Sequence, residues 1–154
     1  MPTVDYFLKI EGIPGESTDI KHPNEIAVEA WSFGESDLGS DTGASGADAG
    51  KVAFRDFHFA AAVSKASPRL IAACAEGQRL KSAVLTCRKS AGLQIEFLVL
   101  KFADVVVASY ETGAGGGSEI MPIDHVALAF AKVEIGYTEQ KPDGTAAPPI
   151  QVTV

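Results

Sequence analysis

Hydrophobic and polar residues alternate along much of the chain, and this period of two predicts β-strands. In Val4–Ile10 the apolar side chains face one way, whereas Asp5 and Lys9 face the other. Residues 25–33 follow the same pattern and end in aromatic side chains. Residues 52–63 form a further strand that is rich in phenylalanine. The first part of the chain therefore predicts strands with one buried face each.

Three further strands are predicted, at residues 80–89, 93–112 and 125–138, with a short turn at 88–92 that makes the first two a hairpin. The last two change phase midway. In residues 125–138 the apolar positions are first even-numbered and then odd-numbered: Val126, Leu128 and Phe130, followed by Val133, Ile135 and Tyr137. A slip of one residue moves the buried face to the other side of a strand, as happens where a strand bends between two sheets. Long bent strands of this kind predict a closed barrel or a tight sandwich.

One segment departs from the period of two and predicts a single short helix over residues 68–76. Ser67 can cap the free amides of the first turn, and Pro68 suits that turn. Gly77 stands where a left-handed residue is expected to end the helix. The fold predicted from the pattern is therefore mainly β, with one helix.

A glycine-rich acidic segment, residues 34–50, interrupts the strands and has almost no apolar side chains. Such a segment cannot bury enough surface to fold by itself. Long loops in compact domains are usually functional or disordered, and the strands on both sides belong to one sheet system. We therefore interpret it as a long loop rather than a linker. Residues 142–154, which contain Pro148 and Pro149, predict an extended tail.

Length and charge narrow the class of protein. The 154 residues are enough for one domain, spanning residues 1–154, and hydrophobic residues make up 46%, which suffices for a core. The net charge of −7 argues against a nucleic-acid partner, which requires a basic face. No apolar run approaches the length that spans a bilayer, so membrane insertion is not expected. Met1 to Glu11 do not resemble a secretory signal, so we expect a protein made in the cytoplasm that would leave the cell without a classical leader.

Catalytic, cofactor and metal sites are not predicted. His22, His58 and His125 are far apart in the sequence and lack ligand spacing. The glycine run 113–117 lacks the Lys and Ser/Thr of a phosphate loop, and no G-x-S-x-G elbow is present. The acids of the long loop match no calcium motif. Cys74 and Cys87 are expected to be buried free thiols. A β-rich chain without such a site indicates a structural or binding protein.

Several segments, taken in order, resemble the Hcp family of type VI secretion tube proteins. The resemblance begins in the first strand and turn, and it continues through Glu25-Ile26 to Ala30-Trp31-Ser32-Phe33-Gly34. It covers residues 4 to about 141 and is carried by these matches: Asp5–Ile10, Ile13–Ser17, Gly50–Val52, Phe54, Asp56–Phe59, Ser67-Pro68, Leu70, Ala73-Cys74, Gly77, Leu85–Arg88, Val126, Leu128, Phe130, Ala131, Val133 and Tyr137. The tail departs from the family, because relatives often end with an aromatic-containing strand and this chain ends in Ile150–Val154 after Asp143-Gly144.

The resemblance implies a β-barrel of two packed antiparallel sheets with one short helix at its side. It also implies a non-enzymatic subunit of hexameric rings that stack into an expelled tube. Partners would be a spike protein at the tip, a contractile sheath and small secreted effectors carried in the lumen. The long loop is a candidate arm that reaches an adjacent subunit or ring, and its candidate contact residues are Glu35, Asp37, Leu38, Asp41, Asp48 and Lys51.

Three alternatives compete with this interpretation. A monomeric β-barrel that binds a small ligand would have an apolar cavity and would not assemble. A hydrolytic or metal-dependent enzyme is disfavoured by the missing motifs. A tube protein fused to a toxin is not expected in 154 residues.

Overall fold

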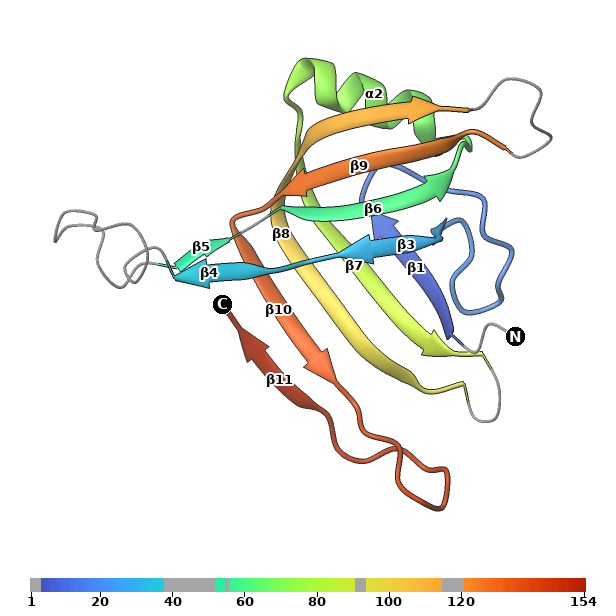
Figure 1. Ribbon diagram of the computed structural model, residues 1–154. Helices are drawn as coiled ribbons and strands as arrows, with labels where there is room; N and C mark the ends of the chain where they lie inside the picture. The colour runs from blue at the N-terminus through green and yellow to red at the C-terminus, as the bar shows by residue number, and fades with distance from the viewer. Residues whose placement is uncertain (1–3, 38–51, 55, 91–93, 115–120) are drawn as a thin grey trace, which may run out of the picture.

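Antiparallel strands dominate the computed structural model, which describes residues 4–37, 52–54, 56–90, 94–114 and 121–154 (Figure 1). In chain order the elements are β1 (Val4–Ile10), β2 (Ile26–Val28), β3 (Ala30–Ser32), β4 (Glu35–Asp37), β5 (Val52–Phe54), β6 (Phe57–Ala62), α2 (Ala66–Glu76), β7 (Arg79–Lys89), β8 (Glu96–Gly113), β9 (Ile123–Ala129), β10 (Lys132–Tyr137) and β11 (Ile150–Thr153). The predicted mainly β fold with one short helix is confirmed over the described residues.

The large sheet closes on itself. Its strands follow the order β2-β1-β7-β8-β9-β6-β3, and β2 and β3 are consecutive pieces of one segment separated by Glu29. The backbone N–H of Glu29 donates to the carbonyl oxygen of Ala60 on β6 over 2.8 Å, which ties this segment to β6. In Figure 1, β3, β6 and β9 cross over β1, β7 and β8, so the closed sheet has the two packed layers that were predicted. We call β1, β7 and the first half of β8 the first layer, and β3, β6, β9 and the second half of β8 the second layer.

β8 is long enough to belong to both layers. Residues 98–103 pair with β10, residues 106–113 pair with β9, and β7 pairs along the other side of β8. Asp104 lies between the two halves and has a φ of 54°, a left-handed value that is uncommon for a residue with a side chain. β9 and β10 pair with successive halves of β8, and the break between them lies beside Asp104. The predicted changes of phase in β8 and in residues 125–138 therefore mark the bend between the two layers.

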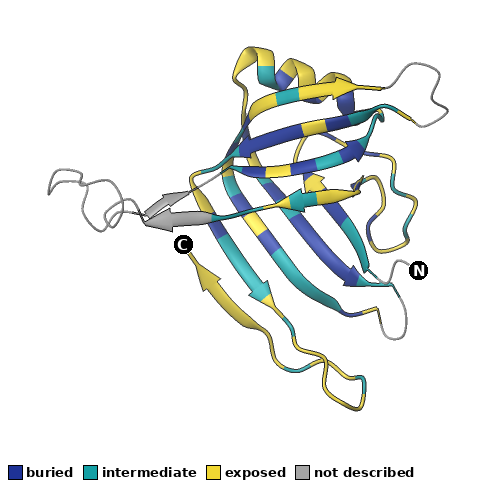
Figure 2. Ribbon diagram, in the orientation of Figure 1, coloured by how far each residue is buried: buried dark blue, intermediate teal, exposed yellow. Residues whose placement is uncertain are grey.

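Aromatic and branched side chains fill the interior. The ring centroids of Phe57 and Phe102 are 4.9 Å apart, and those of Phe102 and Phe130 are 4.8 Å apart. Other fully buried side chains come from strands of both layers: Leu8, Leu85, Val105, Leu128 and Val133. Figure 2 shows the buried positions concentrated in the barrel strands, whereas β11 is exposed along its whole length. The barrel interior is therefore a packed core.

The helix begins earlier than predicted and is held differently. Lys65 occupies the N-cap position without a side-chain hydrogen bond, so the predicted capping role of Ser67 is wrong. Ser67 lies inside the first turn, where its buried Oγ accepts the N–H of Ser64 over 3.1 Å. At the other end Gly77 has a φ of 61°, and its N–H donates toward the carbonyl oxygen of Cys74, so the predicted left-handed end is confirmed.

Some predicted strands are divided. Residues 25–33 form β2 and β3 because the chain passes between layers at Glu29, and residues 52–63 form β5 and β6. The predicted loop 34–50 is wrong in its first part, because β4 is a strand that pairs with β5 in antiparallel register. The tail is extended as predicted, since β11 pairs with β10.

Candidate functional site

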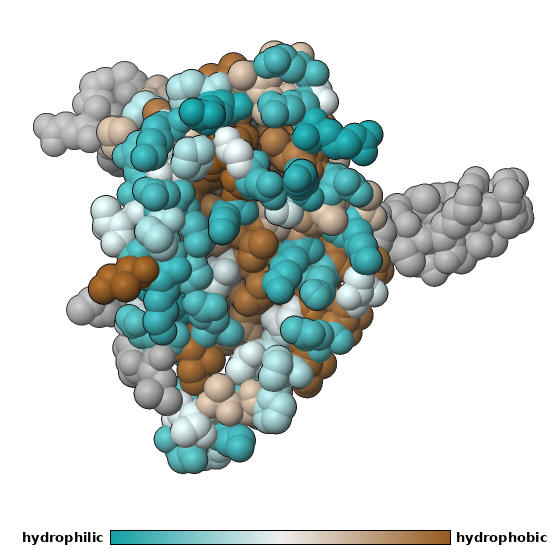
Figure 3. Space-filling view, turned by 180° about the vertical axis from the view of Figure 1, so that it is seen from behind, coloured by the Kyte–Doolittle hydropathy of each residue, from teal (hydrophilic) through white to brown (hydrophobic). Residues whose placement is uncertain are grey.

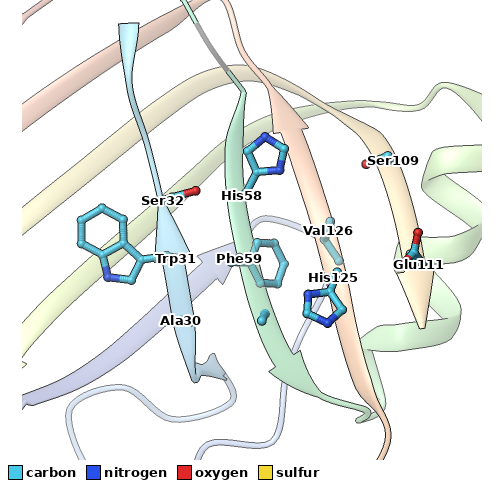
Figure 4. A pocket seen from close by; sticks show the side chains of 10 residues that line it. Ala30, Trp31, Ser32, His58, Phe59, Ser109, Glu111, His125 and Val126 are labelled. Atoms are coloured by element: carbon cyan, nitrogen blue, oxygen red, sulfur yellow. The ribbon is translucent and has the colours of Figure 1, made fainter. Parts of the chain in front are cut away.

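A wide groove of about 400 Å³ lies on the outward face of the second layer, over β3, β6, β9 and the end of β8 (Figure 4). Alternation along these strands sends every second side chain into the core and the others into the groove. The outward side chains are small or polar. They are Ala30, Ser32, His58, Ala60, Ser109, Glu111 and His125, and apart from the partly buried Ala60 each is exposed.

Strand pairing brings together histidines that are distant in sequence. His58 lies opposite Ala127 and His125 lies opposite Ala60, so the two imidazoles are diagonal neighbours on β6 and β9. Glu111 on β8 lies directly opposite His125. The sequence interpretation treated these histidines as unrelated, because the pairing of strands more than 60 residues apart leaves no local signal. Across the described residues, no group of three or more His, Cys, Asp or Glu is placed to hold a metal ion.

The predicted contact loop is only partly within the described structure. Glu35 and Asp37 lie on β4, opposite Phe54 and Val52 of β5. Leu38, Asp41, Asp48 and Lys51 lie outside the described residues. Figure 1 shows the β4–β5 hairpin extending beyond the barrel, away from α2. The contact role of these residues stays a prediction.

A buried arginine fastens the connection between β1 and β2 to the outer face of the first layer. Arg88 is 3% exposed, and its guanidinium donates to both carboxylate oxygens of Asp19, over 3.0 and 2.8 Å, and to Asp5 over 3.1 Å. The guanidinium carbon lies 4.9 Å from the ring centroid of Phe7. The hydrogen bonds from Arg88 lower the pKa of Asp19 to about 2. The sequence placed Arg88 at the overlap of the predicted strand 80–89 and the predicted turn 88–92, and it lies within β7.

His22 forms a second fastening in the same connection. Its ring stacks on Phe7, with centroids 4.6 Å apart and planes 10° apart. Nδ1 lies 3.0 Å from Glu25 and Nε2 lies 2.7 Å from Glu96, which is on β8. Burial of the ring lowers the pKa of His22, but the bonds to Glu96 and Glu25 outweigh burial and leave this pKa above its ordinary value. The connection between β1 and β2 is therefore held to the barrel at two points: Asp19 binds Arg88 of β7, and His22 binds Glu96 of β8.

A buried carboxylate joins the helix to the second layer. Asp124 on β9 is 2% exposed and accepts hydrogen bonds from Ser67 Oγ of α2 over 2.5 Å and from Tyr110 Oη of β8 over 2.6 Å. Burial, together with Asp124, raises the pKa of Tyr110. None of these three residues was singled out as a network from the sequence, because their spacing along the chain follows no motif.

The remaining sequence predictions concern thiols and membranes. Both cysteines are free, as predicted, but only Cys87 is fully buried, whereas Cys74 is half-buried. Burial raises the pKa of Cys87 to about 11. Within the part of the chain that the structure describes, no helix is long and apolar enough to cross a bilayer.

Comparison with known proteins gives one consistent result. Residues 7–137 match the family described as type VI secretion system effector, Hcp. The chain is 42% identical to protein hcp1 of Pseudomonas aeruginosa over 142 residues, covering 92% of this chain and 87% of that protein. The crystal structure of Hcp1 from Salmonella typhimurium superposes with a TM-score of 0.80 at 30% identity, covering 99% and 94% of the two chains. A type VI secretion system effector from Yersinia pestis gives a TM-score of 0.78 at 31% identity, covering 97% and 98%.

Proposed function

The chain belongs to the Hcp family of type VI secretion tube proteins, and on that premise we propose that it forms hexameric rings whose channel is lined by the groove face. One observation carries this assignment. The outward face of β3, β6, β9 and β8 is a broad layer of small and polar side chains, such as Ser32 and His58, backed by a packed core. A hydrated surface of this kind suits the wall of a channel that small effectors occupy.

Rings of this kind stack head to tail into a tube. In this proposal a spike protein caps the tube, a contractile sheath drives it, and it leaves the cell without a cleaved signal peptide. The segment 34–50 is the arm that contacts an adjacent subunit or ring, and its candidate contact residues remain Glu35, Asp37, Leu38, Asp41, Asp48 and Lys51. The alternative of a monomeric ligand-binding barrel has less support, because side chains such as Phe57 and Phe102 fill the interior.

Electron microscopy and light scattering test the ring. We expect annular particles with about six times the 16.1 kDa mass of the chain. A monomer at every concentration would contradict the proposal. Deletion of residues 36–49 tests the arm separately, because rings should still form whereas stacked tubes should shorten. Tubes of normal length in the deletion variant would exclude a role for the arm in stacking.

A pair of substitutions tests the channel wall. Ala60→Trp places a large side chain in the groove, whereas Ala72→Trp places the same side chain on an exposed position of α2. Both variants should form rings. Only Ala60→Trp should lose co-purification of a small effector expressed with it. Equal retention of the effector by both variants would show that the groove does not face the cargo.

A further inference from the structure

Three titratable side chains line the groove on the outward face of the second layer: His58 on β6, His125 on β9 and Glu111 on β8. All three are exposed, and Figure 4 shows the two imidazoles on neighbouring strands with Glu111 beyond His125. Glu111 lies directly opposite His125, and His58 is the diagonal neighbour of His125. The other two positions between the histidines are Ala60 and Ala127, so no larger side chain separates the imidazoles.

A bulge in β8 turns Glu111 toward the histidines. The register between β8 and β9 shifts after Val107, so Ala108 is an extra residue on β8. Inward positions are odd-numbered before the bulge, as at buried Val107, and even-numbered after it, as at Tyr110, whose hydroxyl reaches buried Asp124. Without this shift Glu111 would point into the barrel. Bulges re-aim side chains in this way and are common beside functional sites.

The charge of the groove lining therefore depends on pH. Carboxylates are ionised at neutral pH, whereas imidazole is the side chain whose charge changes between about pH 5 and pH 8. At the upper end of this range the lining carries the negative charge of Glu111, and at the lower end two imidazoliums outnumber that carboxylate. Two further carboxylates lie beside the groove without lining it, Glu29 before β3 and Asp56 before β6. Acidification thus turns the lining from negative to positive.

The opposite side of the molecule has a different chemistry. Figure 3 shows it from behind, with hydrophobic surface between hydrophilic flanks. The third histidine, His22, lies at the outer face of the first layer, where it is buried and already bonded to Glu25 and Glu96. Its imidazole is closed to a ligand. The histidines that an external ligand can reach are therefore the two in the groove.

The spacing of these two imidazoles suits an extended acidic peptide. Diagonal neighbours on adjacent strands are about 7–8 Å apart, a spacing that fits two carboxylates rather than one. In an extended chain, side chains two residues apart point the same way and are about 7 Å apart. Aspartates at alternate positions therefore match the imidazoles of His58 and His125. The groove is wide and crosses four strands, so it has room for such a segment.

We propose that the groove binds an extended acidic protein segment, with aspartate or glutamate at alternate positions, at acidic pH and releases it at neutral pH. Protonated His58 and His125 hold the carboxylates of the segment. Glu111 pairs with His125 at acidic pH and repels the segment when the imidazoles are neutral. The inference rests on the proposed function for the role of the ligand as a carried effector, and it adds the charge of that ligand and the condition that holds it.

The test follows the anisotropy of a labelled peptide, Ser-Asp-Ser-Asp-Ser, with the full chain at pH 7.5 and pH 5.5 and constant ionic strength. Affinity should rise about tenfold on acidification, because each exposed charge pair contributes up to about fivefold. The isomer Ser-Ser-Asp-Asp-Ser should gain less, since adjacent side chains in an extended chain point to opposite sides. An all-serine peptide is the uncharged control. No gain for the alternating peptide, or an equal gain for its isomer, would overturn the inference.

Substitutions separate the charge of the groove from its shape. His58→Gln with His125→Gln should remove the gain on acidification, whereas His58→Lys with His125→Lys should bind the alternating peptide at both pH values, because lysine keeps its proton. Glu111→Gln should strengthen binding at both pH values. Ala72→Lys with Ala75→Lys adds the same charge on the exposed side of α2, and it should leave the wild-type pH dependence unchanged. A full acid gain in the glutamine variant would overturn the inference.

Light scattering at both pH values separates this inference from the proposed function. If the wild type is monomeric and still gains affinity for the peptide at pH 5.5, the ring proposal fails and the acid-dependent site is upheld. If rings form and the peptide binds equally at both pH values, only this inference is overturned. Circular dichroism checks that each variant keeps the fold.

Discussion

His22 Nε2 lies 2.7 Å from Glu96 Oε2, although 74 residues separate the two side chains in sequence. Its other ring nitrogen lies 3.0 Å from Glu25. An ionised carboxylate only accepts hydrogen bonds, and a neutral imidazole donates only one. Both contacts are made together only when His22 is an imidazolium. The protonated form of His22 therefore holds the connection between β1 and β2 against β8.

This arrangement predicts a loss of stability at alkaline pH. Because the pKa of His22 is raised in the folded state, its contribution is fully present below the ordinary imidazole pKa of about 6.5. The contribution is lost as pH rises through the raised folded value. Urea unfolding of the wild type and of His22→Gln should therefore differ most near pH 6, and the difference should shrink toward pH 9. A difference that grows with pH would contradict the prediction.

A substitution of Glu96 tests the same contact directly. Glu96→Gln removes one negative charge beside the imidazole of His22, so the pKa of His22 measured by NMR should fall relative to the wild type. Glu76→Gln makes the same change at an exposed position near the end of α2 and should leave that pKa unchanged. Other titratable side chains also lie at this connection. They are Glu25, Asp19, Asp5 and Arg88, and neither variant replaces any of them.

Asp124 is expected to be the most sensitive polar residue in the core. Asp124→Asn replaces one carboxylate oxygen by an amide donor, which then opposes a hydroxyl donor of Ser67 or Tyr110. An unsatisfied buried polar group costs about 1–3 kcal/mol, so the free energy of unfolding should fall by that amount. Ser109→Ala, on the exposed face of β8, should change it by less than about 0.5 kcal/mol. Equal effects of the two substitutions would contradict a role for Asp124 in holding α2.

Tyr110 reports the same network by a different observable. Because burial and Asp124 both raise its pKa, removal of the negative charge in Asp124→Asn should lower the Tyr110 pKa. Ultraviolet difference spectra would follow the change. An unaltered value would mean that Asp124 has little electrostatic effect on the phenol.

Periodicity predicted the parts of this fold that depend on local alternation. The change from even to odd apolar positions after Phe130 located the bend where β9 and β10 separate. It did not give the partners of either strand, because pairing depends on segments far away in sequence. The same limit hid the groove, since His58 and His125 become neighbours only when β6 pairs with β9.

Polar networks were the least predictable part. Ser67 is a residue type that often caps helices, which is why a capping role was predicted. In the folded chain its hydroxyl instead donates to Asp124, 57 residues away. Arg88 lies at the end of the predicted strand 80–89, and two aspartates, Asp5 of β1 and Asp19 of the connection after it, compensate its burial. A charged side chain can be buried only when it is paired with groups of opposite charge or with hydrogen-bond partners. The sequence does not show which residues pair when they are this far apart along the chain.

The two thiols should differ in reactivity. Cys87 is fully buried and its pKa is raised to about 11, whereas Cys74 is half-buried on α2. The thiolate is the reactive form, so a thiol reagent at neutral pH should modify one cysteine per folded chain and two per unfolded chain. Cys74→Ser should leave the folded chain unreactive. Rapid modification of Cys87 in the folded Cys74→Ser variant would contradict the packing of the first layer.

Gly15 is expected to be indispensable for the connection between β1 and β2. A Cβ atom at this position would lie 2.5 Å from the carbonyl oxygen of Glu25, and this neighbour is backbone that cannot rotate away. The N–H of Gly15 also donates to Asn24 over 2.8 Å, which holds the two arms of the connection together. Gly15→Ala must therefore displace one arm, and overpacking of this kind costs about 1–3 kcal/mol. Gly113→Ala is the matched control, because a Cβ there meets no atom within 4 Å. The Gly15 variant should also raise deuterium uptake at residues 16–24, because the contacts of Asp19 and of His22 both depend on the backbone course of this connection. If the two alanine variants unfold at the same temperature, the close approach at Gly15 does not constrain the connection.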